Sequence, residues 1–350
     1  MKNLFVINTP FHLLSAFILT KTIYQNDENY LALVRSHGYA EWDKDRLMQY
    51  LSSQEAGYQE VFPLIYWLSS KKKDNVSLAM QAQNVKETIG RITFDRAFLG
   101  CDVDPYNQLL LSTIGIESFY RMDDGMYSYS YAEKRRNLLH QTFHRWKASY
   151  MKRKMKVRSD LPINTVANGE SLAGKGDFLY LPELLKRYSP QVIEITTEQI
   201  QTAMQELAKQ NLYTSICPNA SEKKIAVYLS QGRLKVEEEV SVLERLKNLL
   251  GETELIYKPH PNDSIDKLAY IRQHLPNVML CDSKIPVEIM LYFEKNITTV
   301  IGYQSTTLVL ARKFTGRDID CISVANLYDK QTIHPVYLEM MKTMRVRFIE

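Results

Sequence analysis

Short apolar runs alternate with helical stretches along most of this chain, and this alternation constrains the fold more than any other feature of the sequence. In the first half we expect strands at residues 4–7, 31–34, 60–63, 96–99 and 118–122. Helices are expected between them at residues 11–24, 42–51, 77–89 and 105–114. Strands and helices in strict succession predict a parallel sheet covered on both faces.

The pattern stops after Asp124 and resumes near Lys224. There we expect strands at residues 225–229, 255–257, 278–281, 298–301 and 321–323, and helices at 236–250, 263–274, 286–292 and 306–314. A chain of 350 residues is long enough for two domains. We therefore expect an α/β protein with the GT-B architecture, in which two Rossmann-like, doubly wound domains face a central cleft. Ligands in such sheets lie at the carboxyl ends of the strands.

The expected domain boundaries follow from this pattern. A Rossmann-like domain covers residues 1–195, a linker with a helix covers 196–222, and a second Rossmann-like domain covers 223–330. From the general architecture, a last helix within 331–350 is expected to pack back on the first domain. The apolar stretch near the N-terminus is interrupted by Asn8, Thr9, Pro10 and His12, so it predicts a buried strand, a turn and a helix rather than a membrane span. We therefore expect a cytoplasmic protein.

Charge and cysteine content argue against several classes of function. The 44 basic and 40 acidic residues give a net charge of +4, which is too weak a bias to predict nucleic-acid binding. The four cysteines are scattered and form no CxxC pair. Zinc and disulfide redox chemistry are therefore not expected, and a reducing compartment fits best.

Asp123, Asp124 and Gly125 directly follow an expected strand. Two adjacent carboxylates repel one another, which can raise the pKa of one of them and make it a usable general base. Gly125 allows the backbone to turn sharply at this point. The alternative is a solvated turn that caps a helix.

The sequence KPHP follows an expected strand of the second half. Pro259 and Pro261 hold the loop rigid around His260, which suits a side chain that must meet a leaving group. A histidine can donate a proton near neutral pH, and Lys258 adds positive charge. The alternative is a histidine with a purely structural place in the loop.

Two more features lie further along the second half. Ser305 and Thr306 open an expected helix, where hydroxyl groups and free backbone amides can bind a phosphate. The alternative is ordinary helix capping. Glu288 lies on an otherwise apolar helix and can accept hydrogen bonds from a ribose, although such an acid more often lies at the exposed edge of the helix.

Taken together, the order and spacing of these motifs resemble the bacterial sialyltransferases, which share an acidic-acidic-Gly motif, a His-Pro motif and a Ser/Thr pair. The resemblance covers residues 225–314 best, and in the first half it rests on residues 123–125 and on the sequence INTPFHLL. The closest group looks like the lipooligosaccharide sialyltransferases of glycosyltransferase family 52, with polysialyltransferases as near relatives. Glu288 and Lys258 are better matched to the multifunctional sialyltransferases.

This resemblance implies an inverting, metal-independent transfer of sialic acid from CMP-sialic acid to a terminal sugar of a bacterial surface glycan, either lipooligosaccharide or capsule. It implies an acceptor-side first domain and a donor-binding second domain. Asp123 would be the general base and Asp124 would orient it, while His260 would act on the departing phosphate held by Ser305 and Thr306. The other donor-binding candidates are Lys258, Pro261, Glu288, Ser230 and Gly232, and the reserve candidates for the base are Glu237 and Glu238.

A metal-dependent reaction is the alternative raised by two apparent DxD motifs. These are Asp102 with Asp104, and Asp318 with Asp320. Asp104 precedes Pro105, as a helix N-cap does. A single phosphate can be neutralised by a histidine, hydroxyl groups and a helix dipole, so we expect neither a metal ion nor a cofactor other than the donor.

Residues 134–158 form a basic segment with apolar side chains interleaved. Such a segment can contact an anionic membrane or an anionic glycan, or it can pack its apolar residues on the core of its own protein. We favour peripheral contact with the inner face of the cell membrane. Two further functions stay open, namely a GT-B enzyme that uses a UDP-sugar donor and a non-catalytic module that binds polyanions; the oligomeric state is not predicted.

Overall fold

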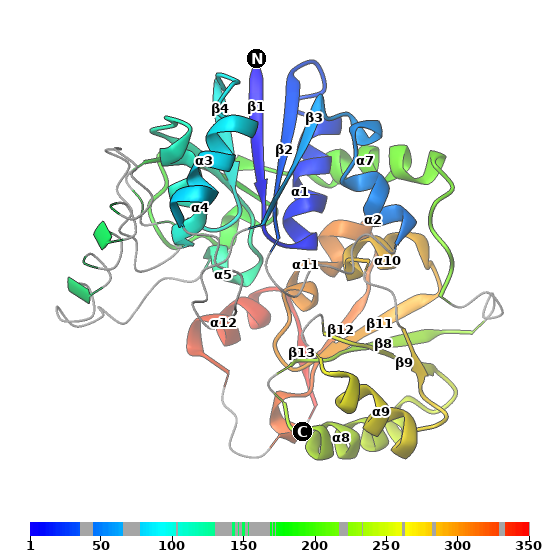
Figure 1. Ribbon diagram of the computed structural model, residues 1–350. Helices are drawn as coiled ribbons and strands as arrows, with labels where there is room; N and C mark the ends of the chain where they lie inside the picture. The colour runs from blue at the N-terminus through cyan, green and yellow to red at the C-terminus, as the bar shows by residue number, and fades with distance from the viewer. Residues whose placement is uncertain are drawn as a thin grey trace. The chain divides into compact units, whose positions relative to one another are not determined.

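The structure is a computed structural model that describes residues 1–35, 45–65, 78–102, 104–129, 142–143, 146, 149–150, 153, 169, 171, 173–216, 223–232, 234–260, 263–281, 285–328 and 333–349. The chain divides into two compact units, Met1–Glu206 and Leu207–Glu350. Each unit has its own parallel sheet, with helices on both faces (Figure 1). The α/β class expected from the sequence is therefore confirmed.

The first unit contains a seven-stranded sheet in the order β3-β2-β1-β4-β5-β6-β7. Its strands are β1 (Lys2–Ile7), β2 (Glu28–Arg35), β3 (Glu60–Ile65), β4 (Arg96–Leu99), β5 (Phe119–Met122), β6 (Gly174–Leu179) and β7 (Val192–Glu194). Its main helices are α1 (Pro10–Lys21), α2 (Arg46–Leu51), α3 (Leu78–Thr88), α4 (Pro105–Thr113) and the short α5 (Met126–Tyr129). Figure 1 shows α1 and α2 on one side of this sheet and α3 and α4 on the other.

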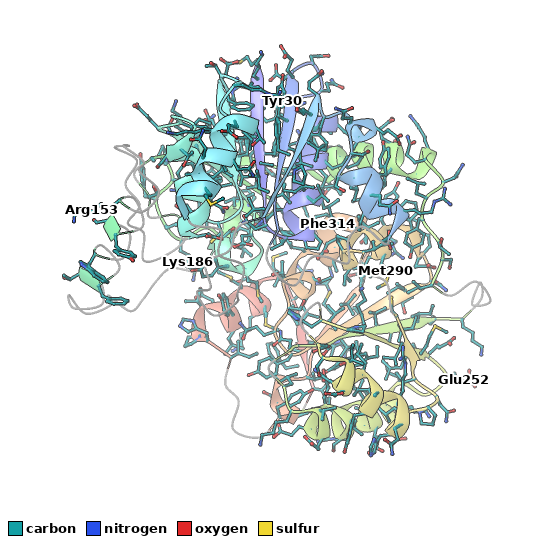
Figure 2. All side chains as sticks on the ribbon, viewed as in Figure 1. Tyr30, Arg153, Lys186, Glu252, Met290 and Phe314 are labelled. Carbon is teal, nitrogen blue, oxygen red and sulfur yellow. The ribbon has the colours of Figure 1, made fainter. Side chains whose placement is uncertain are left out.

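Aromatic side chains fill much of the core of the first unit. The rings of Phe5 on β1 and Phe98 on β4 stack with their centroids 4.6 Å apart, and both side chains are completely buried. Tyr30 on β2, labelled in Figure 2, contacts Phe94 edge-on at 5.3 Å. Burying such large apolar side chains is the main favourable contribution to the stability of a sheet of this kind.

Strands β6 and β7 correct the sequence-based expectation, which placed no strand between Asp124 and Lys224. Strand β6 has the sequence GKGDFL and carries a charged residue, Asp177, whose side chain is completely buried. Asp177 is stabilised there by ion pairs with Arg121 and Arg187. Arg121 lies 56 positions and Arg187 10 positions from Asp177, both outside β6, so the sequence of β6 itself does not reveal a strand.

The second unit contains a six-stranded parallel sheet in the order β10-β9-β8-β11-β12-β13. Its strands are β8 (Ile225–Leu229), β9 (Glu254–Lys258), β10 (Met279–Leu280), β11 (Ile297–Gly302), β12 (Asp320–Ser323) and β13 (Arg347–Phe348). Its helices are α8 (Val236–Leu250), α9 (Ile265–His274), α10 (Val287–Phe293), α11 (Thr306–Thr315) and α12 (Pro335–Thr343). In Figure 1, α8 and α9 cover one face and α10 and α11 the other, and Met290 and Phe314 of that second pair are buried (Figure 2).

Two helices lie where the sequence placed a linker helix and a last helix. Helix α7 (Thr197–Lys209) contains the point at which the two units divide. Helix α12 contacts α11, and β13, which the sequence did not predict, pairs with β12 at the edge of the second sheet. The expected packing of the last helix on the first half stays a prediction. Within the described ranges, no helix combines the length and the apolar character needed to cross a bilayer.

The two sheets have equivalent strand orders. In each, the chain starts in the middle of the sheet, builds outward on one side and then returns to build on the other, so the order reverses between β1 and β4 and between β8 and β11. Ligands of open α/β sheets bind outside the carboxyl ends of the strands at such a reversal point. The residues after these strands are therefore the first place to look for a site.

Candidate active site

The carboxylate of Asp123 is completely buried at the end of β5. Its Oδ2 accepts hydrogen bonds from the Tyr129 hydroxyl and, at 3.0 Å, from the Tyr180 amide, and its Oδ1 accepts one from the Gly125 amide at 2.7 Å. Burial raises the pKa of Asp123 from 3.8 to about 7, and the three hydrogen bonds oppose this effect. Both oxygens are thus engaged by the protein, and the carboxyl group holds the turn together.

Asp124 has the opposite environment. Its side chain is 22% exposed, and its Oδ1 lies 2.7 Å from Nε2 of His12, which is buried. The Asp124 amide donates a hydrogen bond to the hydroxyl of Ser128 at 2.6 Å. Within the described part of the chain, Oδ2 of Asp124 has no hydrogen-bond partner. One oxygen of this carboxylate is therefore held in place, and the other is available to a ligand.

His12 reaches Asp124 because of how α1 begins and how closely β4 approaches it. The Thr9 hydroxyl caps the helix by accepting a hydrogen bond from the His12 amide at 3.1 Å. The imidazole lies against Gly100 at the end of β4, where an added Cβ atom would be 2.1 Å from Nε2. Strands β1, β4 and β5 are parallel neighbours, so the residues that follow them share one edge of the sheet.

A pair of asparagines joins two turns at this edge. Asn8 follows β1, Asn107 lies on α4, and their side-chain amides exchange two hydrogen bonds of 3.0 and 2.8 Å. Asn107 also donates to the Cys101 carbonyl oxygen at 2.9 Å. The buried Asn107 therefore ties the turn after β1 to α4, while the partly exposed Asn8 and Asp124 leave polar groups at this edge of the sheet.

Asp102, from the first apparent DxD motif, belongs to a buried ion cluster. Its carboxylate pairs with Arg121 at 2.7 Å and accepts hydrogen bonds from the amides of Gly169 and Ser171. Of the second motif, Asp318 pairs with Arg312 at 3.3 Å, and Asp320 pairs with Arg347. Across the residues that the structure describes, no group of three or more potential metal ligands comes together. Asp102, Asp318 and Asp320 thus each have an arginine partner.

In the second unit, two predicted loops lie along one edge of the sheet. Lys258 ends β9, His260 follows two residues later, and Ser305 follows β11 as the N-cap of α11. Strand β8 lies between β9 and β11, and the three strands are parallel. Since neighbouring strands are about 4.8 Å apart, the ends of β9 and β11 are about 10 Å from one another. The structure therefore places His260 and the Ser305–Thr306 turn at the same edge of the sheet.

The carboxylate of Glu288 on α10 is hydrogen-bonded to the start of α11. This buried carboxylate accepts a hydrogen bond of 2.8 Å from the Thr307 hydroxyl on α11. Burial raises the pKa of Glu288, while the Thr307 hydrogen bond and the positive charge of Lys258 act to lower it. Ser305 and Thr306 are partly exposed beside Glu288, and the Ser305 hydroxyl accepts a hydrogen bond from the Thr307 amide at 3.3 Å.

Lys267, whose side chain is 10% exposed, ties the loops after β8 and β9 together. Lys267 on α9 forms ion pairs with Glu239 at 2.6 Å and with Asp263 at 3.0 Å, and donates to the Ser230 hydroxyl at 2.9 Å. Asp263 in turn accepts a hydrogen bond from the His260 amide at 2.8 Å. Ser230, a predicted donor-binding residue, thus uses its hydroxyl within the protein, where it holds its own loop against α9.

The remaining predicted residues lie near this edge or outside the described residues. Gly232 is exposed, and Glu237 is exposed in the first turn of α8. Glu238 is 30% exposed and forms an ion pair with Lys235 at 3.5 Å. Pro261 lies outside the described residues, so the structure says nothing of it. The roles of all the predicted site residues stay predictions.

The basic segment 134–158 is described only in part. Phe143, Trp146 and Tyr150 are 58%, 63% and 48% exposed. Their rings lie in a row, with centroid distances of 6.2 Å and 5.8 Å between successive pairs. These three aromatic side chains therefore contact one another and remain largely in solvent, which disagrees with the alternative that they pack on the core of the protein.

Comparison with known proteins identifies the family. Residues 3–323 match the alpha-2,8-polysialyltransferase (POLYST) family. The chain belongs to the alpha-2,8-polysialyltransferase family. It is thus a glycosyltransferase and a sialyltransferase, and the predicted resemblance to bacterial sialyltransferases is confirmed. The matching family is the one that the sequence placed as near relatives of the lipooligosaccharide group. No curated protein sequence matches the chain.

Solved structures of low sequence identity share the fold of this sialyltransferase. MnaA of S. aureus in complex with UDP has a TM-score of 0.58 and 12% identity, with 98% of this chain and 86% of that chain covered. A 2,6-sialyltransferase of Photobacterium sp. JT-ISH-224, solved with CMP and lactose, has a TM-score of 0.54 and 14% identity, with 99% and 78% covered. These similarities confirm the GT-B type of fold, with two Rossmann-like units in one chain.

Several residues of the site were missed by the sequence analysis. His12, Asn8 and Asn107 come from segments that showed only a strand, a turn and two helices. Lys267 lies in a helix whose spacing shows nothing unusual, whereas Thr307 is the third of three consecutive hydroxyl residues at the start of an expected helix. Two signals pointed toward His12, namely a histidine within the apolar stretch after the first strand and its place in the sequence INTPFHLL, on which the resemblance partly rests.

Proposed function

We propose that this sialyltransferase transfers sialic acid from CMP-sialic acid to a glycan acceptor with inversion and without a metal ion. The observation that carries the proposal is the carboxylate of Asp124, which has one oxygen held by His12 at 2.7 Å and the other without a partner among the described residues. This is the arrangement that a general base needs, because its reactive oxygen must be both oriented and accessible.

In the proposed reaction, the acceptor hydroxyl attacks the anomeric carbon of sialic acid from the side opposite the phosphate. The new bond forms between the acceptor oxygen and this carbon, and the hydroxyl proton passes to Asp124. The bond between the same carbon and the CMP phosphate oxygen breaks, and its electron pair leaves with the phosphate. We assign the base to Asp124 rather than to Asp123, because the oxygens of Asp123 are buried and take three hydrogen bonds.

We assign the donor to the second unit. His260, Ser305 and Thr306 lie at the edge of the sheet where a phosphate can meet an imidazole, hydroxyl groups and the N-terminus of α11, which has ten residues. Glu288 would bind the ribose hydroxyls, with Lys258 beside it. A single phosphate carries less charge than a diphosphate, so these groups are sufficient to stabilise its departure in the absence of a metal ion.

For the acceptor, we propose a bacterial surface glycan, either lipooligosaccharide or capsule, as the sequence predicts. The name of the family favours an acceptor that ends in sialic acid, because an alpha-2,8 linkage joins one sialic acid to another. The partly exposed side chains of Asp124 and Asn8 at the reversal point of the first sheet can hydrogen-bond such a hydroxyl-rich ligand.

Transfer and hydrolysis of CMP-sialic acid, measured in EDTA, test this proposal. We expect wild-type activity to persist in EDTA. Asp124→Asn should lower the rate of transfer by on the order of 10²- to 10⁴-fold, which is the usual contribution of a general base. His260→Ala should also lower the rate of transfer. Glu237→Gln, which alters the reserve base candidate, should retain activity. Activity that requires added Mg²⁺, or thermal stabilisation by UDP but not by CMP, would overturn the proposal in favour of a metal-dependent or UDP-sugar enzyme.

We also propose peripheral contact of residues 134–158 with an anionic membrane. The support is the exposed row of Phe143, Trp146 and Tyr150 in a segment rich in lysine and arginine. Binding to liposomes of anionic lipid at low salt should weaken when Trp146 is replaced by Ser. If the protein ignores anionic liposomes, or if the same change leaves binding intact, this part of the proposal is wrong.

A further inference from the structure

We propose that His12 is a positioning residue of the transfer reaction. It holds one oxygen of the Asp124 carboxylate so that the other is directed at the acceptor hydroxyl. This inference rests on the proposed function, because it takes Asp124 to be the base. His12 itself does not need to touch the substrate, since its side chain is only 1% exposed.

The contacts of the imidazole determine which nitrogen carries the proton. Nε2 lies 2.7 Å from Oδ1 of Asp124, and the buried Nδ1 has no hydrogen-bond partner among the described residues. A buried N–H group without an acceptor is costly, and an ionised carboxylate only accepts hydrogen bonds. The neutral ring therefore carries its proton on Nε2 and donates it to Asp124, with a bare nitrogen at the buried Nδ1 position.

The surroundings of the ring leave it one orientation. The Thr9 hydroxyl binds the His12 amide at the start of α1, which sets the position of the backbone. On the other side, the ring fills the space where Gly100 lacks a side chain, and a Cβ atom there would lie 2.1 to 2.4 Å from three ring atoms. An imidazole held by a helix cap and a glycine is a rigid donor, and rigidity is what a reacting carboxylate requires.

The consequence for the reaction follows from the partly exposed position of Asp124. Without a donor on Oδ1, the carboxylate can rotate about its χ2 bond and meet solvent in many orientations. Misplacement of a reacting group by about 1 Å can cost on the order of 100-fold in rate. We therefore expect loss of the His12 donor to lower kcat by about 10- to 100-fold, with little change in the KM for the donor, whose site lies in the second unit.

The first test compares two substitutions of His12 with a control on the same helix. His12→Leu removes the donor, whereas the amide nitrogen of His12→Gln takes a place near that of Nε2 and can restore the hydrogen bond. Thr20→Val removes a buried hydroxyl two turns further along α1 and should leave kcat unchanged. The inference predicts a low kcat for His12→Leu and a partly recovered kcat for His12→Gln. The KM for CMP-sialic acid should be unchanged in both variants.

A double substitution separates positioning from a general structural role. If His12 acts only through Asp124, then His12→Leu should have no further effect on kcat in a protein that already carries Asp124→Asn. Equal losses in both backgrounds, or a Gln variant as impaired as Leu, would overturn the inference. A wild-type protein that transfers nothing from CMP-sialic acid would instead refute the proposed function.

The hydrogen bond between His12 and Asp124 can also be tested without substrate, even if the protein shows no transfer activity. The nitrogen NMR spectrum of histidine-labelled protein distinguishes the two neutral tautomers, and the His12 signals can be assigned by their loss in His12→Gln. We expect the tautomer with the proton on Nε2, and a shift of that nitrogen when Asp124→Asn replaces the carboxylate. A proton on Nδ1, or a spectrum that does not respond to Asp124→Asn, would rule the inference out.

Discussion

Asp123→Asn should change how the stability of the first unit depends on pH. The wild-type carboxyl has a pKa of about 7 in the folded protein, against an ordinary value of 3.8. The folded state therefore keeps this proton over a range of pH in which the unfolded state has lost it. Stability from this group is fully present below the unfolded pKa and is lost as the pH rises through the folded pKa.

The size of this change in stability follows from the difference between the pKa of Asp123 in the folded protein and its ordinary value. About three pH units at ~1.4 kcal/mol per unit give ~4 kcal/mol, which is lost between about pH 4 and pH 7. The side chain is completely buried, so solvent screening does not reduce this figure. An asparagine stays neutral throughout. The wild type should therefore lose ~4 kcal/mol of free energy of unfolding relative to Asp123→Asn as the pH rises across this window.

Urea denaturation followed by tryptophan fluorescence is a suitable assay. All three tryptophans lie in the first unit, as Trp42, Trp67 and Trp146, so their emission reports on the unfolding of that unit. Glu55→Gln, which alters an exposed carboxyl of the same unit, is the control and should follow the wild type at every pH. Parallel pH profiles for the wild type and Asp123→Asn would refute the reasoning, since they would mean that Asp123 is ionised in the folded protein at acidic pH.

Three other substitutions have defined outcomes. Gly100→Ala puts a Cβ atom 2.1 Å from Nε2 of His12, so kcat for transfer should fall by about 10- to 100-fold. CMP binding, measured by calorimetry, should stay unchanged. Tighter or weaker CMP binding would count against the assignment of His12 and Gly100 to the acceptor side of the reaction. Lys267→Met leaves Glu239 and Asp263 buried without their cation and should cost about 3–5 kcal/mol in urea unfolding followed by circular dichroism, and a cost below about 1 kcal/mol would contradict it. Glu288→Gln should raise the Kd for CMP by about 10- to 100-fold, because hydrogen bonds to a charged group contribute about 1.5–3 kcal/mol, and an unchanged Kd would remove Glu288 from the ribose site.

Much of the fold could be predicted because parallel strands buried on both faces are short, continuous apolar runs. Strands β1, β4 and β8 were predicted to within two residues at each end, since all their side chains except those of Lys2 and Arg96 at the strand starts are buried. Strand β6 was not, because Gly174 and Gly176 look like loop residues and Asp177 looks solvent-exposed. A Cβ atom at Gly174 would lie 2.2 Å from the Arg121 guanidinium, so the glycine that suggests a loop makes room for the ion cluster.

The site was harder to predict than the fold, because its contacts join residues far apart in sequence. The sequence could show that two carboxylates follow β5, but it could not show which of them would be buried. Successive side chains at the end of a strand point in opposite directions, and here Asp123 points toward Tyr129 while Asp124 points toward His12. That choice depends on α1, whose contact with Asp124 spans 112 positions.

The two units have equivalent strand orders, and we propose that they take different roles in the reaction. In both, polar residues follow the strands next to the reversal point, but their chemistry differs. The first unit presents a carboxylate held by an imidazole, which suits removal of a proton. The second presents hydroxyl groups, a histidine and a lysine, which suit a departing phosphate. Substitutions of Asp124 or Gly100 should therefore lower kcat and spare the KM for the donor, whereas Glu288 and Ser305 substitutions should raise that KM. If Asp124→Asn raised the donor KM as much as Glu288→Gln does, the two roles could not be divided between the units in this way.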